Sequence, residues 1–166
     1  MFQLKSLSRE AIPGALEKAH RYRLLNEPLE AESICRDILE VDPGNQEATV
    51  ALLLALTDQF EERQNPCVEQ AREVLSRIQD DYSRTYHAGI VCERRAKAQL
   101  KRGGVRAGYI AYEWFTEAMQ NFESAAEIRP AGNDDAILRW NTCARILMAS
   151  SALAPEPEET SRSWLE

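Results

Sequence analysis

Side chains that could catalyse a reaction, such as Ser, Cys, Asp and Glu, are abundant in this sequence but form none of the common catalytic motifs. His20 and His87 are the only histidines, and the sequence has no HExxH, CxxC, GxSxG or Gly-rich phosphate loop. Glu17 and His20 have the Glu-x-x-His spacing of di-metal helical bundles, but such a site needs two copies of that motif and only one is present. We therefore expect no catalytic residue, no metal site and no cofactor.

The four cysteines also point to a structural role. Cys35, Cys67, Cys92 and Cys143 are far apart, and each falls within a predicted helix. Single cysteines in helices are more often small buried apolar residues than disulfide partners or metal ligands. We expect all four to lie in the core.

Positive charge is concentrated in one segment, residues 84–106. It holds seven basic residues and one acid, Glu93, a net of +6 in a chain whose net charge is −7. The basic residues are Arg84, Arg94, Arg95, Lys97, Lys101, Arg102 and Arg106. Two interpretations stay open: a solvated helix face paired with neighbouring acids, or a site for an acidic partner. Nucleic acid is a poorer candidate, because a chain with a pI of about 5.0 repels a polyanion elsewhere.

Two similar turns indicate how the chain positions these residues. Asp42-Pro43-Gly44-Asn45 recurs as Arg129-Pro130-Ala131-Gly132-Asn133, in both cases followed by acidic residues. Each copy combines a proline that cannot continue a helix, a glycine free to take positive φ, and an asparagine suited to cap the next helix. The recurrence predicts a repeat of helix pairs.

Hydrophobic periodicity predicts an all-α fold of seven helices without a strand. Their expected ranges are about 13–25, 28–41, 45–62, 65–79, 83–102, 105–128 and 134–150. The third contains Val50–Leu56, which is apolar on every face and therefore belongs in the middle of the fold. The fifth and sixth are separated only by Gly103-Gly104 and form an extended hairpin. Tyr109, Tyr112 and Trp114 in its overhang either pack on the fifth helix or are partly exposed.

The first helix pair resembles the tetratricopeptide repeat, a helix-turn-helix of about 34 residues. Small or apolar residues occupy its packing positions, namely Ala15, Ala19, Tyr22, Ala31, Cys35 and Ile38, and Ala19 and Leu53 are one repeat length apart. The resemblance is closest over residues 12–56, and later units carry insertions. It implies a right-handed stack of antiparallel helix pairs, about three and a half repeats, over residues 1–150.

The resemblance also implies where a partner would bind. In tetratricopeptide proteins the first helix of each pair lines a concave groove, and the corresponding residues here are Leu16, His20, Arg23, Val50, Leu54, Thr57, Tyr86, Ile90, Arg94 and Lys97. One end of this groove is predicted to be apolar and the other basic. Family members that clamp a C-terminal carboxylate use lysine and asparagine where this chain has Leu16, His20 and Ala51, so it departs from them.

These observations favour a non-catalytic adaptor. Its partner, a protein or peptide with acids and apolar anchors, would bind in the groove or at a basic tip formed by Lys101, Arg102 and Arg106. The alternatives are a polyanion-binding protein that uses residues 84–106, and a self-association module. The sequence has no apolar run long enough for a bilayer and no uncharged signal core, which favours a cytoplasmic protein without a membrane partner.

Residues 151–166 lose helical periodicity and are expected to form a disordered acidic tail. The tail carries Glu156, Glu158 and Glu159 and ends in Trp164-Leu165-Glu166. An unselected terminus is one interpretation, and a segment that docks in the groove as a competitor for the ligand is the other.

Overall fold

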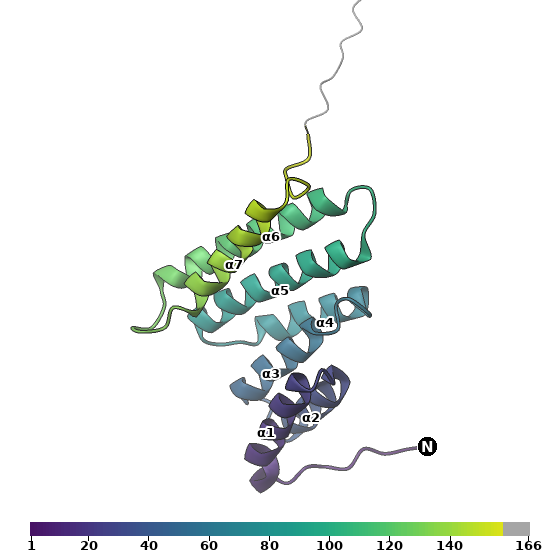
Figure 1. The fold of residues 1–166 in the computed structure, drawn as a ribbon. Helices are drawn as coiled ribbons and strands as arrows, with labels where there is room; N and C mark the ends of the chain where they lie inside the picture. Colours follow the sequence, from purple (N-terminus) through teal and green to yellow (C-terminus); the bar gives the residue numbers. More distant parts are fainter. Residues whose placement is uncertain (158–166) are drawn as a thin grey trace, which may run out of the picture.

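The computed structural model describes residues 1–157, apart from the side chains of residues 64–66. Over this range the chain forms seven α-helices and one short 3-10 helix, with no strand, as predicted. The 3-10 helix is Arg9–Ala11, and the α-helices are α1 Ile12–Leu24, α2 Pro28–Val41, α3 Gln46–Thr57, α4 Gln64–Ser76, α5 Asp81–Arg102, α6 Ala107–Glu127 and α7 Asp135–Ala149. Consecutive helices pack against one another, so that the fold is a stack from α1 and α2 to α6 and α7 (Figure 1).

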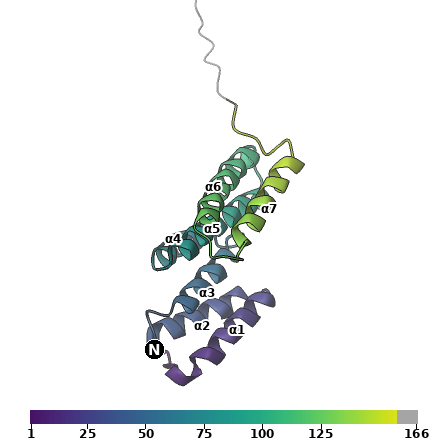
Figure 2. The same ribbon diagram turned by 90° about the vertical axis from the view of Figure 1, so that its left-hand side faces the viewer.

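The third helix pair is the longest, which confirms the extended hairpin. Helices α5 and α6 have 22 and 21 residues, whereas the other helices have 12 to 15. The turn between them contains Gly103 at φ 76° and Gly104 at φ 111°, a backbone region that favours glycine. Figures 1 and 2 show the two helices side by side along their length.

The two repeated turns start their helices in related but different ways. The Asn45 side chain accepts a hydrogen bond of 2.9 Å from the backbone N–H of Ala48, as an N-cap residue does. In the second copy Asn133 accepts one of 3.0 Å from the N–H of Asp135. Gly132 has a positive φ of 79°, but Gly44 does not, so the first turn closes without a left-handed glycine.

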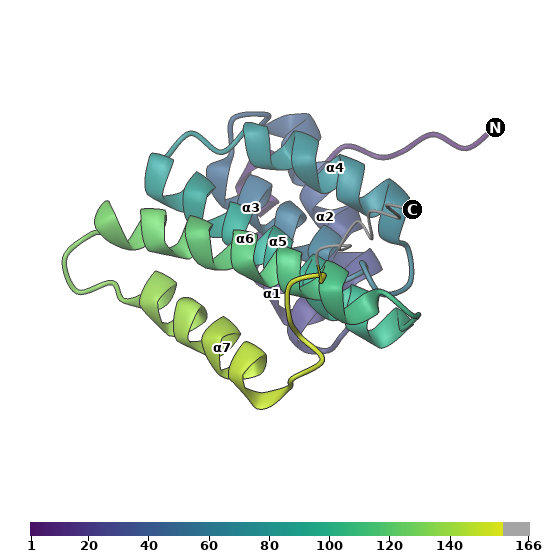
Figure 3. The ribbon, with the colours of Figure 1, turned by 90° about the horizontal axis from the view of Figure 1, so that it is seen from above.

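Two hydrophobic clusters form the core. The first is built mainly from α1–α4 and includes the fully buried Leu53 and Phe60. The second is built from α5–α7 around Phe115 and Phe122. Helix α3 is buried on nearly all sides, as its apolar sequence predicted, and Leu54 on it packs against the second cluster. Figure 3, which looks down on α6 and α7, shows them as neighbours at this end of the stack.

All four cysteines are buried free thiols, as the sequence predicted. Burial raises the pKa of Cys35, Cys92 and Cys143 to about 12. Burial also raises the pKa of Cys67. These thiols therefore stay protonated near neutral pH, which makes them poor nucleophiles in the folded protein.

The first part of the expected tail is packed on the helices, which corrects the boundary predicted at residue 150. Leu153 is buried in the second cluster, and Arg106 forms an ion pair with Glu156. The chain passes so close to α6 that a Cβ atom on Gly108 would lie 2.2 Å from the carbonyl oxygen of Ala152. A buried leucine and a glycine-permitted approach hold this segment, although it has no helical periodicity. Residues 158–166, with Trp164, lie outside the described residues.

Gly89 allows α5 and α6 to approach closely. A Cβ atom at this position would lie 2.5 Å from the ring of Phe122, which is fully buried. We expect Gly89→Ala to lower the free energy of unfolding by about 1–3 kcal/mol through overpacking, even though alanine is the better helix former by about 1 kcal/mol. Chemical denaturation measures this difference.

The matched control is Gly14→Ala in α1, because nothing lies within 4 Å of a Cβ atom there. We expect this variant to keep or gain stability, by up to about 1 kcal/mol. Equal stability of the two variants would show that the packing of α5 on α6 does not require a glycine.

Candidate binding groove

Two adjoining hollows lie where α1 and the link after α3 face α5 and α7. The first, of about 450 Å³, is lined by His20, Arg23 and Leu24 of α1 together with Asn26, and the second, of about 210 Å³, by Lys97 of α5 and Arg139 of α7 among others. Both also contain Asp58, Glu61 and Arg94, so they form one continuous depression. We call this surface the ionic groove. Its residues come from α1, the link after α3, α5 and α7.

Asp58 joins α1 to α5 through two arginines. The residue directly follows α3, and its carboxylate accepts hydrogen bonds from Nε of Arg23 and from Nη1 of Arg94, both at 2.7 Å. Arg23, Asp58 and Arg94 are 35 and 36 residues apart in the sequence, close to one repeat length. The first helix of the first pair, the residue after the first helix of the second pair, and the first helix of the third pair therefore each contribute one charged side chain to this centre.

Glu93 forms a second ionic centre, in which a fully buried carboxylate is held by two cations. Lys97, one turn further along α5, and Arg139 of α7 both bind it, the latter through Nη1 at 3.2 Å from each carboxylate oxygen. A buried carboxylate is costly unless it is paired and hydrogen-bonded. Burial alone would lower the pKa of Arg139, but Glu93 and a hydrogen bond with Tyr86 outweigh burial and raise that pKa. Arg139 is thus a permanent cation.

The ionic groove carries an excess of positive charge. Its two ionic centres contain four cations and two carboxylates, a surplus of two positive charges in a protein whose net charge is −7. Glu61 does not cancel this surplus, because it pairs with Lys101. The four cationic side chains are between 19% and 38% exposed, so a ligand in the groove can reach them.

Some of the predicted groove residues line the ionic groove. His20, Arg23, Arg94 and Lys97 do so, and Thr57 borders its second hollow although it is nearly fully buried. His20 also lies 3.5 Å from Glu47. The basic part of the predicted groove therefore lies on this surface.

The predicted apolar end is not an open surface. Leu16 and Ile90 are buried in the first and second clusters, and Val50, Leu54 and Tyr86 are half-buried against these clusters. The stack uses these side chains to pack its own helices, which leaves them unavailable to a partner.

An apolar rim lies instead at the turn between α1 and α2. Leu24 lines the first hollow and is 89% exposed, and Leu25 and Leu29 nearby are 61% and 55% exposed. The sequence analysis did not single out these leucines. The sequence feature that could have indicated them is the pair Leu24-Leu25 at a helix end, directly before the polar turn residue Asn26. Asn26 has a positive φ of 59° in the structure.

The basic segment 84–106 does not form a single basic face. Ion pairs join Arg84 to Asp81, Lys101 to Glu61 and Arg106 to Glu156. Arg95 instead lies over the ring of Trp114 on α6, 3.5 Å from its centroid, which favours the packed interpretation of that tryptophan. Arg102, the third predicted tip residue, ends α5. The segment therefore fits the interpretation in which most basic side chains pair with neighbouring acids.

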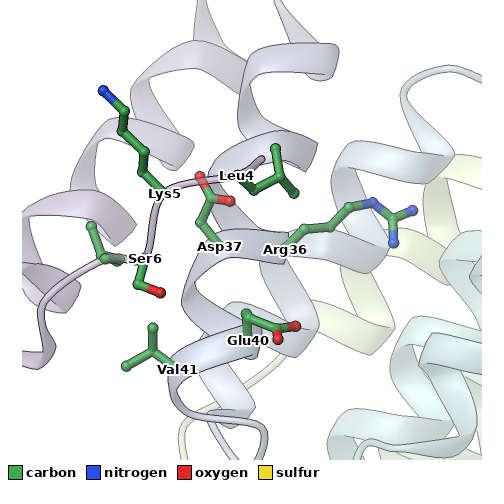
Figure 4. Close-up of a pocket in the computed structure, with 8 residues that line it drawn as sticks. Leu4, Lys5, Ser6, Arg36, Asp37, Glu40 and Val41 are labelled. Atoms are coloured by element: carbon green, nitrogen blue, oxygen red, sulfur yellow. The ribbon is translucent and has the colours of Figure 1, made fainter. Parts of the chain in front are cut away.

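Another hollow, of about 310 Å³, lies between the N-terminal segment and α2 (Figure 4). Lys5, Asp37 and Glu40 line it, together with aliphatic residues. Arg36 points away from the N-terminal segment in Figure 4 and pairs with Glu32 at 2.8 Å. Because its charged groups do not converge on a common point, this hollow is a weaker candidate site.

Comparison with known proteins adds no relatives: no family model matches the sequence, and neither a curated protein nor a solved structure shows significant similarity to it. Within residues 1–157, no three histidine, cysteine, aspartate or glutamate side chains come together as metal ligands. None of the helices described is both long and apolar enough to span a bilayer.

The two lysines of the groove region should differ in their effect on stability. Lys97 binds the buried Glu93, whereas Lys101 binds the exposed Glu61. We expect Lys97→Ala to lower the free energy of unfolding by about 1–3 kcal/mol, because Glu93 loses one of its two cations. Lys101→Ala should leave the denaturation midpoint unchanged. Equal midpoints for both variants would show that Arg139 alone is sufficient for Glu93.

Proposed function

We propose that this protein is a non-catalytic interaction module that holds a peptide segment of a partner protein in the ionic groove. The observation that carries the proposal is the groove itself, which combines exposed parts of four cations with an exposed leucine rim. Polar groups beside apolar contacts are the composition of a protein interface. The tetratricopeptide resemblance supports the same function, and membership of that family remains part of the proposal.

The pairing of the basic segment weakens the alternative of a polyanion-binding protein. Five of its seven basic residues form ion pairs with acids of this chain, and they are distributed between the groove and other surfaces. A polyanion is bound best by basic side chains that share one face. Buried thiols without disulfides fit a reducing compartment, which supports the cytoplasmic location proposed from the sequence.

The groove can be blocked selectively because the four native thiols are buried. Glu61→Cys introduces an exposed thiol in the groove, where Glu61 is 44% exposed, and a maleimide-linked polyethylene glycol then covers the site. Glu69→Cys on α4 is the matched control, because Glu69 is also an exposed acid that pairs with a basic side chain, at 3.7 Å from Arg72.

We expect random peptides selected by display on the unmodified protein to lose binding when residue 61 is labelled and to keep it when residue 69 is labelled. Titration of the selected peptides measures both affinities. Peptides that bind equally well to both labelled proteins would place the binding surface elsewhere.

A further inference from the structure

We infer that the ligand of the ionic groove is an acidic peptide segment with an aliphatic or aromatic side chain next to its carboxylates. This inference rests on the proposed groove function and adds the chemistry of the partner. Three features carry it: the surplus of cations, their spacing on α5, and the position of the leucine rim.

Each ionic centre has one more cation than it has carboxylates. Asp58 lies between Arg23 and Arg94, and Glu93 lies between Lys97 and Arg139. A guanidinium group has five N–H donors, and Arg94 contacts Asp58 through Nη1 alone. Further donors therefore remain for a second carboxylate, and a charge-assisted hydrogen bond to a ligand carboxylate would neutralise the surplus at each centre.

The spacing of the cations suits two acidic groups. Arg94 and Lys97 are three residues apart on α5, so that their Cβ atoms are roughly 5–6 Å apart on one face of the helix. Arg23 approaches from α1 on one side and Arg139 from α7 on the other. A segment with two carboxylates about one helical turn apart can therefore contact both ionic centres at once.

The leucine rim locates the apolar part of the ligand. Leu24 shares the first hollow with Arg23 and Arg94. Leu29 instead lines a neighbouring hollow of about 250 Å³ whose charged residues are mainly acidic, namely Glu27, Glu30, Asp58 and Glu62 beside Arg63. Large apolar side chains that are exposed together mark interaction sites, and Leu24 is the one that borders the cationic surface directly. The ligand must therefore carry its apolar side chain beside its acids.

Asp58 has a special position in this scheme, because it is an internal carboxylate bound to the same arginines that a ligand would use. Removing its charge should strengthen the attraction for an acidic ligand, whereas removing the charge of Arg94 should weaken it. A general loss of structure would weaken binding in both variants. The opposite signs therefore separate recognition from misfolding.

The probe is a fluorescein-labelled synthetic peptide of glutamate and leucine, and its control has glutamine in place of every glutamate. We expect the glutamate peptide to bind at least about tenfold more tightly, and its affinity to fall as salt is raised. Arg94→Gln should weaken binding about fivefold to tenfold, and Asp58→Asn should tighten it by a similar factor. Arg72→Gln on α4 changes the net charge equally and should have no effect. Fluorescence anisotropy measures all of these affinities.

Two results would overturn the inference while leaving the proposed groove function in place. One is that the glutamine peptide binds as tightly as the glutamate peptide and that labelling of residue 61 prevents both from binding. The other is weaker binding of the glutamate peptide to Asp58→Asn. Failure of both peptides to bind would reject the acidic ligand. The peptides selected by display would then still test whether the groove binds a peptide at all.

The end of the chain itself is a competing occupant, because it is acidic and contains Trp164 and Leu165. The full chain with Glu158→Gln, Glu159→Gln and Trp164→Ser distinguishes it from an external ligand. An unchanged affinity for the glutamate peptide supports an external partner. Tighter binding would instead assign the groove to the protein's own C-terminal residues.

Discussion

Close approach of helix backbones is the constraint on which the structure depends. Small residues are buried between the helices, and alanines such as Ala19, Ala31, Ala71 and Ala118 are fully inaccessible to solvent. Small residues let neighbouring helices approach until larger side chains, such as Phe122 against Gly89, fill the space beside them. This spacing places side chains of successive helices within hydrogen-bonding distance. The short bonds of Asp58 to two different helices are a direct result.

The last helix shows what the ionic contacts add to this packing. Only Ala136 and Cys143 of α7 are fully buried, so apolar burial gives this helix fewer constraints than it gives α3. The contact of Arg139 with Glu93 adds a directional constraint on α7, because the buried carboxylate must be paired and hydrogen-bonded by a cation placed close to its oxygens. The orientation of α7 on α5 and α6 thus depends on a polar contact as well as on apolar packing.

Much of the fold could be predicted from the sequence because it depends on local signals. The apolar stretch around Leu53, the Asn45 cap and the Gly103-Gly104 turn are readable from adjacent residues, and they fixed the number and order of helices. The boundary near residue 151 could not be predicted in this way. Leu153 is buried in the second cluster beside the close approach of Ala152 to Gly108, a contact between residues 44 positions apart that leaves no periodic pattern.

The candidate site was less accessible to sequence reasoning. Arg23, Arg94 and Lys97, which line the ionic groove, were named because the first helix of each pair lines the groove in tetratricopeptide proteins. Leu16 and Ile90 were misplaced, because apolar residues at such positions can face either a partner or the next helix. The packing of distant helices decides whether such a side chain is buried, and neighbouring residues in the sequence do not show which helices will pack there.

The position of the groove at the junction of the two hydrophobic clusters has a mechanical consequence. Arg23 and Asp58 belong to the α1–α4 half, and Arg94, Lys97 and Arg139 belong to the α5–α7 half. Stacked helices contact mainly their neighbours, so rotation of one half on the other is resisted chiefly where α3 and α4 meet α5. A segment lying across this junction would brace both halves at once. A bound segment would then restrict rotation of the α1–α4 half relative to the α5–α7 half. Binding would couple the two ends of the stack in this way without any change in their folds.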